Sequence, residues 1–220
     1  MADEPEHCCF DDWADSYAKR ARQRRLGGVS QDLIRVLDVV GLKGRTILDV
    51  GCGAGGLVLE ALEHGAQTAT GIDLSAASID QARRISSERG LSHRATFAVA
   101  DGSSASLVAH DVVVLDKVFC CFEDVDGLLN NSLSAAGSVY AFSVPPSTGL
   151  RGAVRRALAV VANRWYRLRR KRFGRFRTHV HDVAALDARV RATGFDRLVS
   201  RRRSAWDLAV YARPGTTLAR

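Results

Sequence analysis

Four aspartates lie at or near the ends of successive short apolar runs that have the composition of strands: Asp49, Asp73, Asp101 and Asp116. At such an end, the carboxylate of Asp73 can accept hydrogen bonds from both hydroxyls of a ribose. The carboxylate of Asp101 can accept from an exocyclic amine such as that of adenine. Taken singly, Asp73 could instead cap a helix, and Asp101 could form a turn. Four such acids in succession favour a binding site.

The loop "GCGAGG" at residues 51–56 lies directly behind the apolar run "TILDV" at 46–50. Its glycines remove side chains, so that a ligand can approach the backbone. A helix that begins near residue 56 points its free N–H groups and the positive end of its dipole at the same place. The loop therefore suits an anionic or carboxylate-bearing group. The alternative is close packing of strand and helix without a ligand.

Strands and helices must alternate along the middle of the chain to bring these residues together. The predicted strands are 46–50, 68–74, 95–101, 111–118 and 138–144, and the predicted helices between them are 56–65, 76–90 and 124–137. This alternation specifies a parallel sheet with helices on both faces. In such a sheet, ligands bind where the loops leave the carboxyl ends of the strands.

The predicted core is flanked by further elements on both sides. Helices are expected at 10–26 and 30–41, with Ser30 as the N-cap and Gly41 as the stop of the second. A helix at 182–195 is followed by two strand-like runs, 196–203 and 205–213, which should pair as an antiparallel hairpin at a sheet edge. The expected fold class is α/β: a Rossmann-like, seven-stranded, mostly parallel sheet with helices on both faces and a C-terminal antiparallel hairpin.

The motifs "LDVGCGAG", "GIDLS", "VADG" and "VVLDKV" together resemble the class I S-adenosylmethionine-dependent methyltransferases, over roughly residues 30 to 213. The runs "CCFDDWADSYAKR" and "VVLDKVFCCFEDVDGLL" look like a bacterial subgroup of mostly unassigned substrate. That subgroup is distantly similar to the methyltransferases of ubiquinone and magnesium-protoporphyrin biosynthesis. The resemblance implies S-adenosylmethionine as the cofactor.

The resemblance also implies roles for residues around the methionine part of that cofactor. Asp49 would anchor the amino group through water, and Gly51, Cys52 and Gly53 would line the methionine and ribose portions. Tyr17, on the first predicted helix, would close over the cofactor.

Further roles concern the adenosine part and the reacting end. Asp73 would hold the ribose hydroxyls, with Leu74 against the adenine. Asp101 would accept from the adenine amine, while the backbone of Gly102 contacts the ring. Asp116 would approach the sulfonium end.

The glycines at 51, 53 and 56 also satisfy the dinucleotide pattern G-x-G-x-x-G, with Asp73 about where a ribose acid would stand. Several features disfavour a nicotinamide enzyme: the helical prelude of some 45 residues, the acid before the glycines, the Asp-Gly pair after the third strand, and the terminal hairpin.

A hydroxyl or protonated amine as methyl acceptor needs a base. The candidates are Asp116, His179, His181 and, more weakly, His7. In "RTHVH", alternation puts both histidines on one side of the chain, although an exposed loop pair without a catalytic role is an equal alternative.

Five cysteines occur as the pairs Cys8/Cys9 and Cys120/Cys121 and the single Cys52. Adjacent pairs do not form a secreted disulfide framework, so reduced, packed thiols and no metal are expected. A four-thiolate metal site from both pairs is the alternative. Cys52 stands near a helix start, which can lower a thiol pKa, but a small residue in a crowded loop is the favoured interpretation.

Residues 151 to 177 contain eleven arginines and lysines and no acid, which leaves a formal charge of −3 on the rest of the +8 chain. The periodicity predicts a basic helix over 150–168 with one apolar stripe: Leu150, Val154, Leu158, Val161, Trp165 and Leu168. We expect a lid whose apolar face roofs the acceptor site. Contact with an anionic membrane surface is the second interpretation, and nucleic acid the third.

Length and composition indicate one globular domain with extensions. The expected segments are a helical cap at 1–29, a cofactor-binding core at 30–146, the basic insertion at 147–181 and a closing helix and hairpin at 182–220. No apolar run approaches the ~20 residues that span a bilayer. The acidic start "MADEPEHCCF" lacks the features of a signal peptide, so a cytoplasmic location is expected.

The expected function is S-adenosylmethionine-dependent methyl transfer to a small molecule, apolar or carboxylated, on O, N or C. The N-terminal helix and the basic insertion would roof the acceptor site. The alternatives are RNA methylation and a regulator that binds the cofactor without catalysis. The sequence indicates neither the acceptor nor the oligomeric state.

Overall fold

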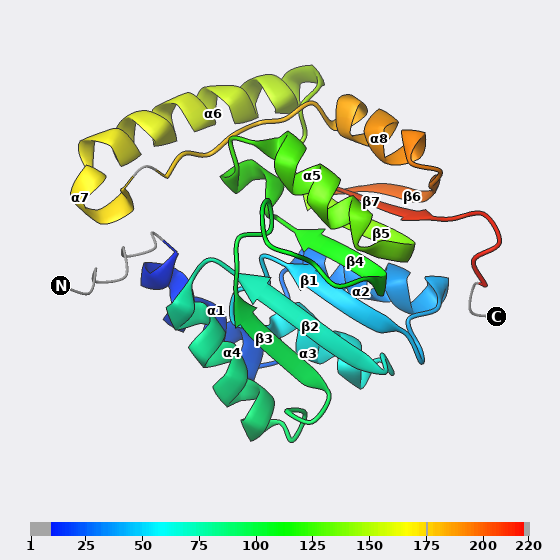
Figure 1. Cartoon of the computed structure of the whole chain (residues 1–220). Helices are drawn as coiled ribbons and strands as arrows, with labels where there is room; N and C mark the ends of the chain where they lie inside the picture. Colours follow the sequence, from blue (N-terminus) through cyan, green and yellow to red (C-terminus); the bar gives the residue numbers. More distant parts are fainter. Residues whose placement is uncertain (1–9, 175, 218–220) are drawn as a thin grey trace.

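The computed structural model describes residues 10–174 and 176–217 of the chain. Its centre is one seven-stranded sheet in the order β3-β2-β1-β4-β5-β7-β6 (Figure 1). The strands are β1 Thr46–Val50, β2 Thr68–Asp73, β3 Ala95–Val99, β4 His110–Asp116, β5 Ala136–Val144, β6 Asp196–Arg203 and β7 Trp206–Ala212. The first five are parallel, and β7 pairs antiparallel with both β5 and β6. The predicted fold class and terminal hairpin are therefore confirmed.

Helices cover both faces of the sheet, as the alternation predicted (Figure 1). The α-helices are α1 Ala14–Arg22, α2 Gly28–Val40, α3 Gly56–Glu63, α4 Ala76–Glu88, α5 Val125–Ser134, α6 Gly149–Leu168, α7 Arg170–Phe173 and α8 Val183–Ala192. Two short 3₁₀-helices, η1 Asp11–Trp13 and η2 Phe119–Cys121, precede α1 and follow β4. The single helix predicted at 10–26 is thus divided into η1 and α1.

The sheet has a hydrophobic core on each of its two faces, and the strand β4 contributes to both. Val112 and Val114 pack with Leu33 of α2 and Val58 of α3 on one face. Val113 and Leu115, which point the other way, pack on the opposite face in the core that α5 and α8 complete. Successive side chains of a strand point to opposite faces, so a strand buried on both sides must be apolar throughout.

The start of α2 differs from the prediction. The N-cap is Gly27, and the helix begins at Gly28, so Ser30 lies inside the first turn and is 3% exposed. Its hydroxyl reaches Asp116 at the end of β4 instead of a backbone N–H of its own helix. The predicted stop is confirmed, because Gly41 caps the C-terminus of α2 with φ of 107°.

The helix α6 lies outside the two helical layers, and the segment that follows α7 returns beside it (Figure 1). Asn163 of α6 binds this segment twice: its side-chain N–H donates to the carbonyl of Thr178 at 2.8 Å, and its side-chain oxygen accepts from the Thr178 N–H at 2.8 Å. No helix in the described part of the chain is long and apolar enough to span a bilayer.

Candidate functional site

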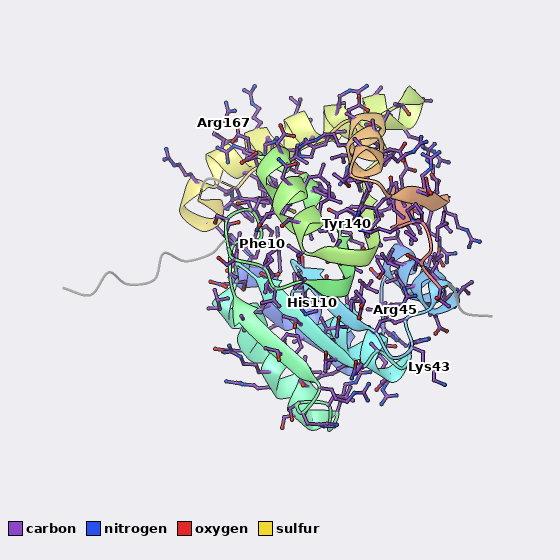
Figure 2. The ribbon with its side chains drawn as sticks, turned by 45° about the vertical axis from the view of Figure 1, so that its right-hand side comes forward. Phe10, Lys43, Arg45, His110, Tyr140 and Arg167 are labelled. Carbon is purple, nitrogen blue, oxygen red and sulfur yellow. The ribbon has the colours of Figure 1, made fainter. Side chains whose placement is uncertain are left out.

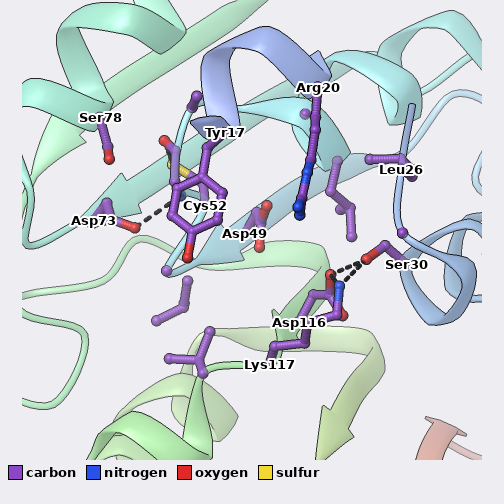
Figure 3. A pocket seen from close by; sticks show the side chains of 18 of the residues that line it. Tyr17, Arg20, Leu26, Ser30, Asp49, Cys52, Asp73, Ser78, Asp116 and Lys117 are labelled. Carbon is purple, nitrogen blue, oxygen red and sulfur yellow. Dashed lines mark hydrogen bonds and ion pairs between the residues drawn. The ribbon is translucent and has the colours of Figure 1, made fainter. Parts of the chain in front are cut away.

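A cavity of about 650 Å³ lies at the carboxyl ends of β1, β2 and β4. Around it stand Asp49, Asp73 and Asp116, and α1 contributes Tyr17 and Arg20 from above (Figure 3). The parallel strands bring their carboxyl ends to the same edge, so residues far apart in the sequence meet there. Three of the four predicted acids therefore line one cavity.

The glycine loop after β1 serves both packing and access. Gly51 has φ of 79°, and a Cβ on it would lie 2.5 Å from Cγ2 of Val118. Gly53 has φ of 52°, and its open side faces the ring of Tyr17 at 3.6 Å. A Cβ on Gly55 would lie 2.8 Å from the Phe97 ring. Gly51 and Gly55 therefore make room for neighbouring side chains, and only Gly53 of the three leaves its open side toward the cavity.

Asp73 is fixed at the end of β2 by two backbone hydrogen bonds. Its Oδ2 accepts from the N–H of Gly53 at 2.8 Å, and its Oδ1 accepts from the N–H of Ser75 at 2.9 Å. Burial raises the pKa of Asp73, although these hydrogen bonds act in the opposite direction. Leu74 follows it along the cavity wall and is partly exposed. The carboxylate is thereby held in one orientation beside an apolar surface.

Asp49 is a buried acid with unmet hydrogen-bonding capacity. It is 2% exposed, and its Oδ1 has no hydrogen-bond partner among the described residues. Burial, followed by the negative charges of Asp116 and Asp73, raises the pKa of Asp49 well above its ordinary value. A cationic donor in the cavity, directly or through water, would stabilise the ionised form.

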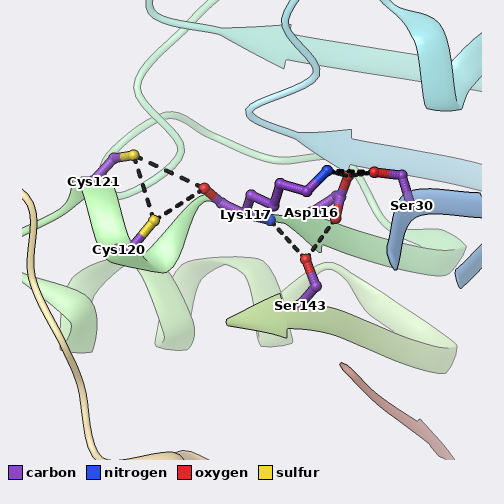
Figure 4. Close-up of polar contacts among 6 residues, drawn as sticks. All are labelled: Ser30, Asp116, Lys117, Cys120, Cys121 and Ser143. Atoms are coloured by element: carbon purple, nitrogen blue, oxygen red, sulfur yellow. Dashed lines mark hydrogen bonds and ion pairs between the residues drawn. The ribbon is translucent and has the colours of Figure 1, made fainter. Parts of the chain in front are cut away.

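Asp116 is the centre of a hydrogen-bonded cluster with Ser30, Lys117 and Ser143 (Figure 4). Its Oδ2 accepts from the Ser30 hydroxyl at 2.5 Å and pairs with the Lys117 ammonium at 3.3 Å. Its Oδ1 accepts from the Ser143 hydroxyl at 2.5 Å. The Lys117 ammonium also donates to the Ser30 oxygen at 2.5 Å.

Lys117 owes its position to an uncommon backbone conformation. Its φ is 64°, in the left-handed region that few residues other than glycine adopt. The Lys117 N–H donates to the Ser143 hydroxyl at 3.0 Å. This turn puts the ammonium of Lys117 in the cavity directly after the carboxylate of Asp116, so the two charges meet at one corner of the site.

Four cationic side chains line the cavity: Arg20, Arg25, Lys117 and Arg203. None of the three arginines was predicted to lie there. Neither Arg20 nor Arg25 forms an ion pair with an acid among the described residues. Arg203, at the end of β6, lies 3.3 Å from the carboxylate of Asp32.

Trp206, at the start of β7, stands beside them, with its ring 5.8 Å from the Lys117 ammonium. For Arg20, the sequence did contain one local indication: it is three residues after Tyr17, so both side chains lie on the same side of α1.

Asp101 does not line the cavity, although Gly102 does. Its Oδ1 accepts from the backbone N–H of Ser103 at 2.8 Å and from the Ser103 hydroxyl at 2.7 Å. This is the turn-forming alternative weighed from the Asp-Gly sequence. A contact between Asp101 and an adenine amine stays a prediction.

The two histidines predicted as bases lie side by side but outside the cavity lining. Their ring centroids are 5.8 Å apart and their ring planes are nearly parallel. The prediction that both side chains lie on one side of the chain is therefore confirmed. His179 donates its backbone N–H to the carbonyl of Cys120, and His181 Nε2 lies 3.0 and 2.9 Å from the carbonyl oxygens of Phe119 and Phe122. Both therefore tie the return segment to η2. His7 lies outside the described residues.

The thiols have packing roles in the described part of the chain. Burial raises the pKa of the Cys52 thiol well above its ordinary value, so the helix start does not activate it. Its Sγ occupies the space that a side chain at Gly71 would need. The Cys120 and Cys121 sulfurs are 3.8 Å apart. Cys8 and Cys9 lie outside the described residues. Within the described residues, no group of three or more His, Cys, Asp or Glu side chains could hold a metal ion.

No residue in the described part of the basic insertion, 147–174 and 176–181, lines the cavity. The insertion does pack on residues that line it: Arg155 lies 5.8 Å from the Trp206 ring, and the Phe176 and Phe10 ring centroids are 5.2 Å apart. That the insertion roofs the acceptor site stays a prediction. The N-terminal part of the roof comes from α1 and from the start of α2, through residues such as Tyr17, Arg20 and Leu26.

Residues 47–136, which include the glycine loop, Asp73 and Asp116, match the family model described as a methyltransferase domain. This part of the chain is a methyltransferase domain. Over 78 residues, the chain is 41% identical to the ribosomal protein L11 methyltransferase of Yersinia pestis. That match covers 36% of this chain and 26% of the relative, so the chain spans about a quarter of the length of the curated relatives it matches.

Solved structures share the architecture of the methyltransferase domain over nearly the whole chain. Magnesium protoporphyrin IX methyltransferase from Synechocystis, with bound S-adenosylhomocysteine, superimposes with a TM-score of 0.66 at 19% identity, over 92% of this chain and 97% of that one. The [4+2]-cyclase SpnF superimposes with a TM-score of 0.68 at 17% identity, over 93% and 94% of the two chains. These likenesses concern the fold.

The cofactor of this methyltransferase family, S-adenosylmethionine, fits the residues that line the cavity. Asp49 offers an unpartnered carboxylate oxygen to an ammonium group. Asp73 presents an oriented carboxylate to a pair of hydroxyls, next to the apolar surface of Leu74. Gly53 leaves its open side to the ligand under the ring of Tyr17.

Proposed function

We propose that this chain transfers a methyl group from S-adenosylmethionine to a small acceptor that carries an anionic group on an apolar body. The observation that supports it most directly is the division of the cavity. Asp49 and Asp73 lie on the side of the glycine loop, whereas Asp116 and Lys117 lie on the other (Figure 3), with the Trp206 ring 5.8 Å from the Lys117 ammonium. One side suits the cofactor, and the other is left for the acceptor.

In this proposal, Asp49 binds the amino group of the methionine part and Asp73 the ribose hydroxyls. Tyr17 closes the cavity from α1, and Arg20, which reaches in beside it, binds the methionine carboxylate. The bound cofactor supplies a methyl group on a positively charged sulfur. The remaining task of the protein is to hold the acceptor in line with that methyl group and to exclude water.

Asp116 is the proposed proton acceptor for a hydroxyl or ammonium group of the substrate. Ser143 and Ser30 hold its carboxylate in one orientation, and Lys117 balances its charge. A substrate O–H or N–H in the cavity would donate to the lone pair of Asp116 Oδ1 that Ser143 leaves, since Oδ2 already accepts from Ser30 and Lys117. The histidines at 179 and 181 take no part in the proposed mechanism, because they lie outside the cavity lining.

The acceptor class follows from the charges and the apolar surface near Asp116. Arg25, Lys117 and Arg203 can bind a carboxylate or another anion, and charge-assisted hydrogen bonds of this kind are the strong ones. Leu26 and Trp206 provide apolar surface for the rest of the molecule. The acceptor is therefore proposed to be a small carboxylated compound.

Calorimetry with S-adenosylmethionine and with S-adenosylhomocysteine tests the cofactor site first. Release of S-adenosylhomocysteine in the presence of aromatic and aliphatic carboxylic acids, and of cell extract with and without ribonuclease, then tests transfer. Heat without turnover in any arm would support the regulator without catalysis, a distinction that matters because a cyclase shares this fold. Absence of heat with both ligands on folded protein would refute the whole proposal.

The charge of the acceptor is tested by Arg25→Gln. Loss of one charge-assisted hydrogen bond should raise the KM for a carboxylated acceptor about tenfold and leave cofactor affinity unchanged. Arg35→Gln is the matched control, because Arg35 is 62% exposed on α2 and does not line the cavity. Equal KM values in the two variants would contradict the proposed anion subsite.

A further inference from the structure

The amphipathic helix α6 directs most of its large apolar side chains toward solvent and packs on the protein through small residues. Its two buried residues are small, Gly152 and Ala159. Seven of its large apolar residues are between 46% and 81% exposed: Val160 and, along one side, Leu150, Val154, Leu158, Val161, Trp165 and Leu168. A helix on the surface of a globular protein normally places such residues against the core. Here the six residues other than Val160 form one apolar stripe that faces solvent, except that the Trp165 ring packs against Phe173, with the ring centroids 4.9 Å apart.

Geometry places the stripe opposite the protein. With 3.6 residues per turn, the six side chains fall within an arc of about 80°. Gly152 and Ala159 lie roughly on the opposite side of the helix. The stripe is therefore a continuous face about 27 Å long, since a helix rises about 1.5 Å per residue.

Contacts on the inner side prevent α6 from turning its stripe inward. A Cβ on Gly152 would lie 2.3 Å from the carbonyl carbon of Ser147, so the helix approaches the backbone too closely for any larger residue there. The Arg156 guanidinium donates to the carbonyl oxygen of Ser147 at 2.5 Å. Asn163 makes its two hydrogen bonds with the backbone of Thr178. These contacts fix the rotation of the helix about its axis.

Arginines flank the stripe on both sides. Arg151 lies next to one edge and Arg164 next to the other, while Arg167 lies further round the helix, and all three are exposed. Figure 2 shows Arg167 on the outer side of α6, away from the sheet. Residues 151 to 177 include no acid in the sequence, so this face of the molecule is strongly positive.

We propose that the apolar stripe of α6 and its flanking arginines dock the protein on an anionic membrane surface. The stripe would enter the boundary between headgroups and acyl chains, where such helices insert by about 5–10 Å. The arginines would bind lipid phosphates, with their long stems along the apolar surface. The inference concerns a surface outside the cavity and does not depend on the reaction proposed above.

Two other occupants fit less well. Nucleic acid phosphates would pair with the arginines but would leave six large apolar side chains in water, whereas a bilayer takes both. A second copy of the chain would cover the apolar stripe but would bring two clusters of arginines together with no acid in either segment. Like charges placed face to face repel, so self-association through α6 is disfavoured.

The test uses the full chain and vesicles of phosphatidylcholine, with and without phosphatidylglycerol. We expect co-sedimentation with the anionic vesicles that weakens as salt is raised. Val161→Glu should weaken this binding at least tenfold. Val39→Glu is the matched control: Val161 is 67% exposed on α6 and Val39 is 71% exposed on α2, so both changes put a glutamate on an exposed helix position. The control should stay within twofold of the unchanged protein.

Charge is tested separately by Arg164→Gln and Arg167→Gln. Each lost arginine should weaken binding to anionic vesicles about fivefold and reduce the salt dependence. Trp165 should give a blue-shifted fluorescence on anionic vesicles that Trp165→Phe removes. Cofactor calorimetry on every variant verifies that the fold is intact.

Three results would overturn the proposal. The first is no binding to anionic vesicles at low salt, or equal loss in Val161→Glu and Val39→Glu. The second is retention of RNA, lost in Val161→Glu, without vesicle binding. The third is a dimer in solution that Val161→Glu dissociates. None of them bears on cofactor binding, which is measured independently.

Discussion

Asp49 has a buried carboxylate oxygen, Oδ1, without a hydrogen-bond partner in the described part of the chain, and such a group favours ligand binding at a cost in folding stability. Burial and two neighbouring acids raise the pKa of Asp49. At pH values between the ordinary and the raised pKa, the folded state keeps a proton that the unfolded state has lost. The contribution of Asp49 to stability therefore falls as pH rises through this window. A buried acid that lowers folding stability in this way is typical of a binding site, because its charge is needed for the ligand.

Asp49→Asn should accordingly raise the Tm of the ligand-free protein at pH 7, because the amide needs no ionisation. The gain should shrink as the pH is lowered toward the ordinary pKa of an aspartate. The same change should weaken binding of S-adenosylmethionine by about 10- to 100-fold, through loss of a hydrogen bond between charged groups. Thermal scans across pH together with calorimetry check both effects, and a lower Tm at pH 7 would contradict the first.

Asp116 is the proposed proton acceptor, so its substitution tests the chemical step. Asp116→Asn should reduce kcat at least about 100-fold, the lower range for removal of a general base. It should leave the affinity for S-adenosylhomocysteine nearly unchanged. Asp80→Asn is the control, since Asp80 is 64% exposed on α4. A kcat equal to that of the control would refute the role given to Asp116.

At the scale of elements, close approach decides where α6 lies. Gly152 is in the interior of this helix, where replacement by alanine ordinarily stabilises by about 1 kcal/mol. Here the added Cβ would meet the backbone of Ser147, which cannot move aside as a side chain can. Packing and helix propensity therefore predict opposite signs.

We expect Gly152→Ala to lower the Tm, because the steric cost of a contact at 2.3 Å exceeds the gain in propensity. Differential scanning calorimetry measures the effect directly. Ala157→Gly changes an exposed position of α6, so it measures the effect of helix propensity alone and should lower the free energy of unfolding by about 1 kcal/mol. A stabilised Gly152→Ala would mean that α6 is not held against residue 147 as the structure has it.

At the scale of the whole molecule, the cavity links elements from both ends of the chain. α1, α2, the strand ends of the core and the β6–β7 hairpin all contribute to its lining. A ligand bound there should therefore stabilise the fold globally. Any ligand that binds only the folded state adds RT ln(1 + [L]/Kd) to the free energy of unfolding.

At 100 times its Kd, S-adenosylhomocysteine should add about 2.7 kcal/mol and raise the Tm by roughly 5–10 °C. Asp73→Asn should remove most of this shift, because it alters the carboxylate that faces the ribose. A thermal shift assay over a ligand titration measures both proteins. A full shift in the variant would show that the ligand binds without Asp73.

Local periodicity determined most of the fold. The strands at 46–50 and 196–203 match their predicted bounds, and other elements differ by a few residues at their ends. Parallel strands place their carboxyl ends at one edge, so the meeting of Asp49, Asp73 and Asp116 was predictable from the sequence. These features depend on short-range patterns and on one topological rule.

Tertiary structure alone decided which polar groups meet. Ser30 and Asp116 are 86 residues apart, and a serine near a helix start gives no local sign that its hydroxyl will leave its own helix. The histidines at 179 and 181 were predicted side by side, but only the fold shows that they bind the carbonyls around η2. The stripe of α6 was also visible in the sequence. Its direction was not, because the inward face of a helix is set by what packs against it, here the close approach of Gly152 to Ser147.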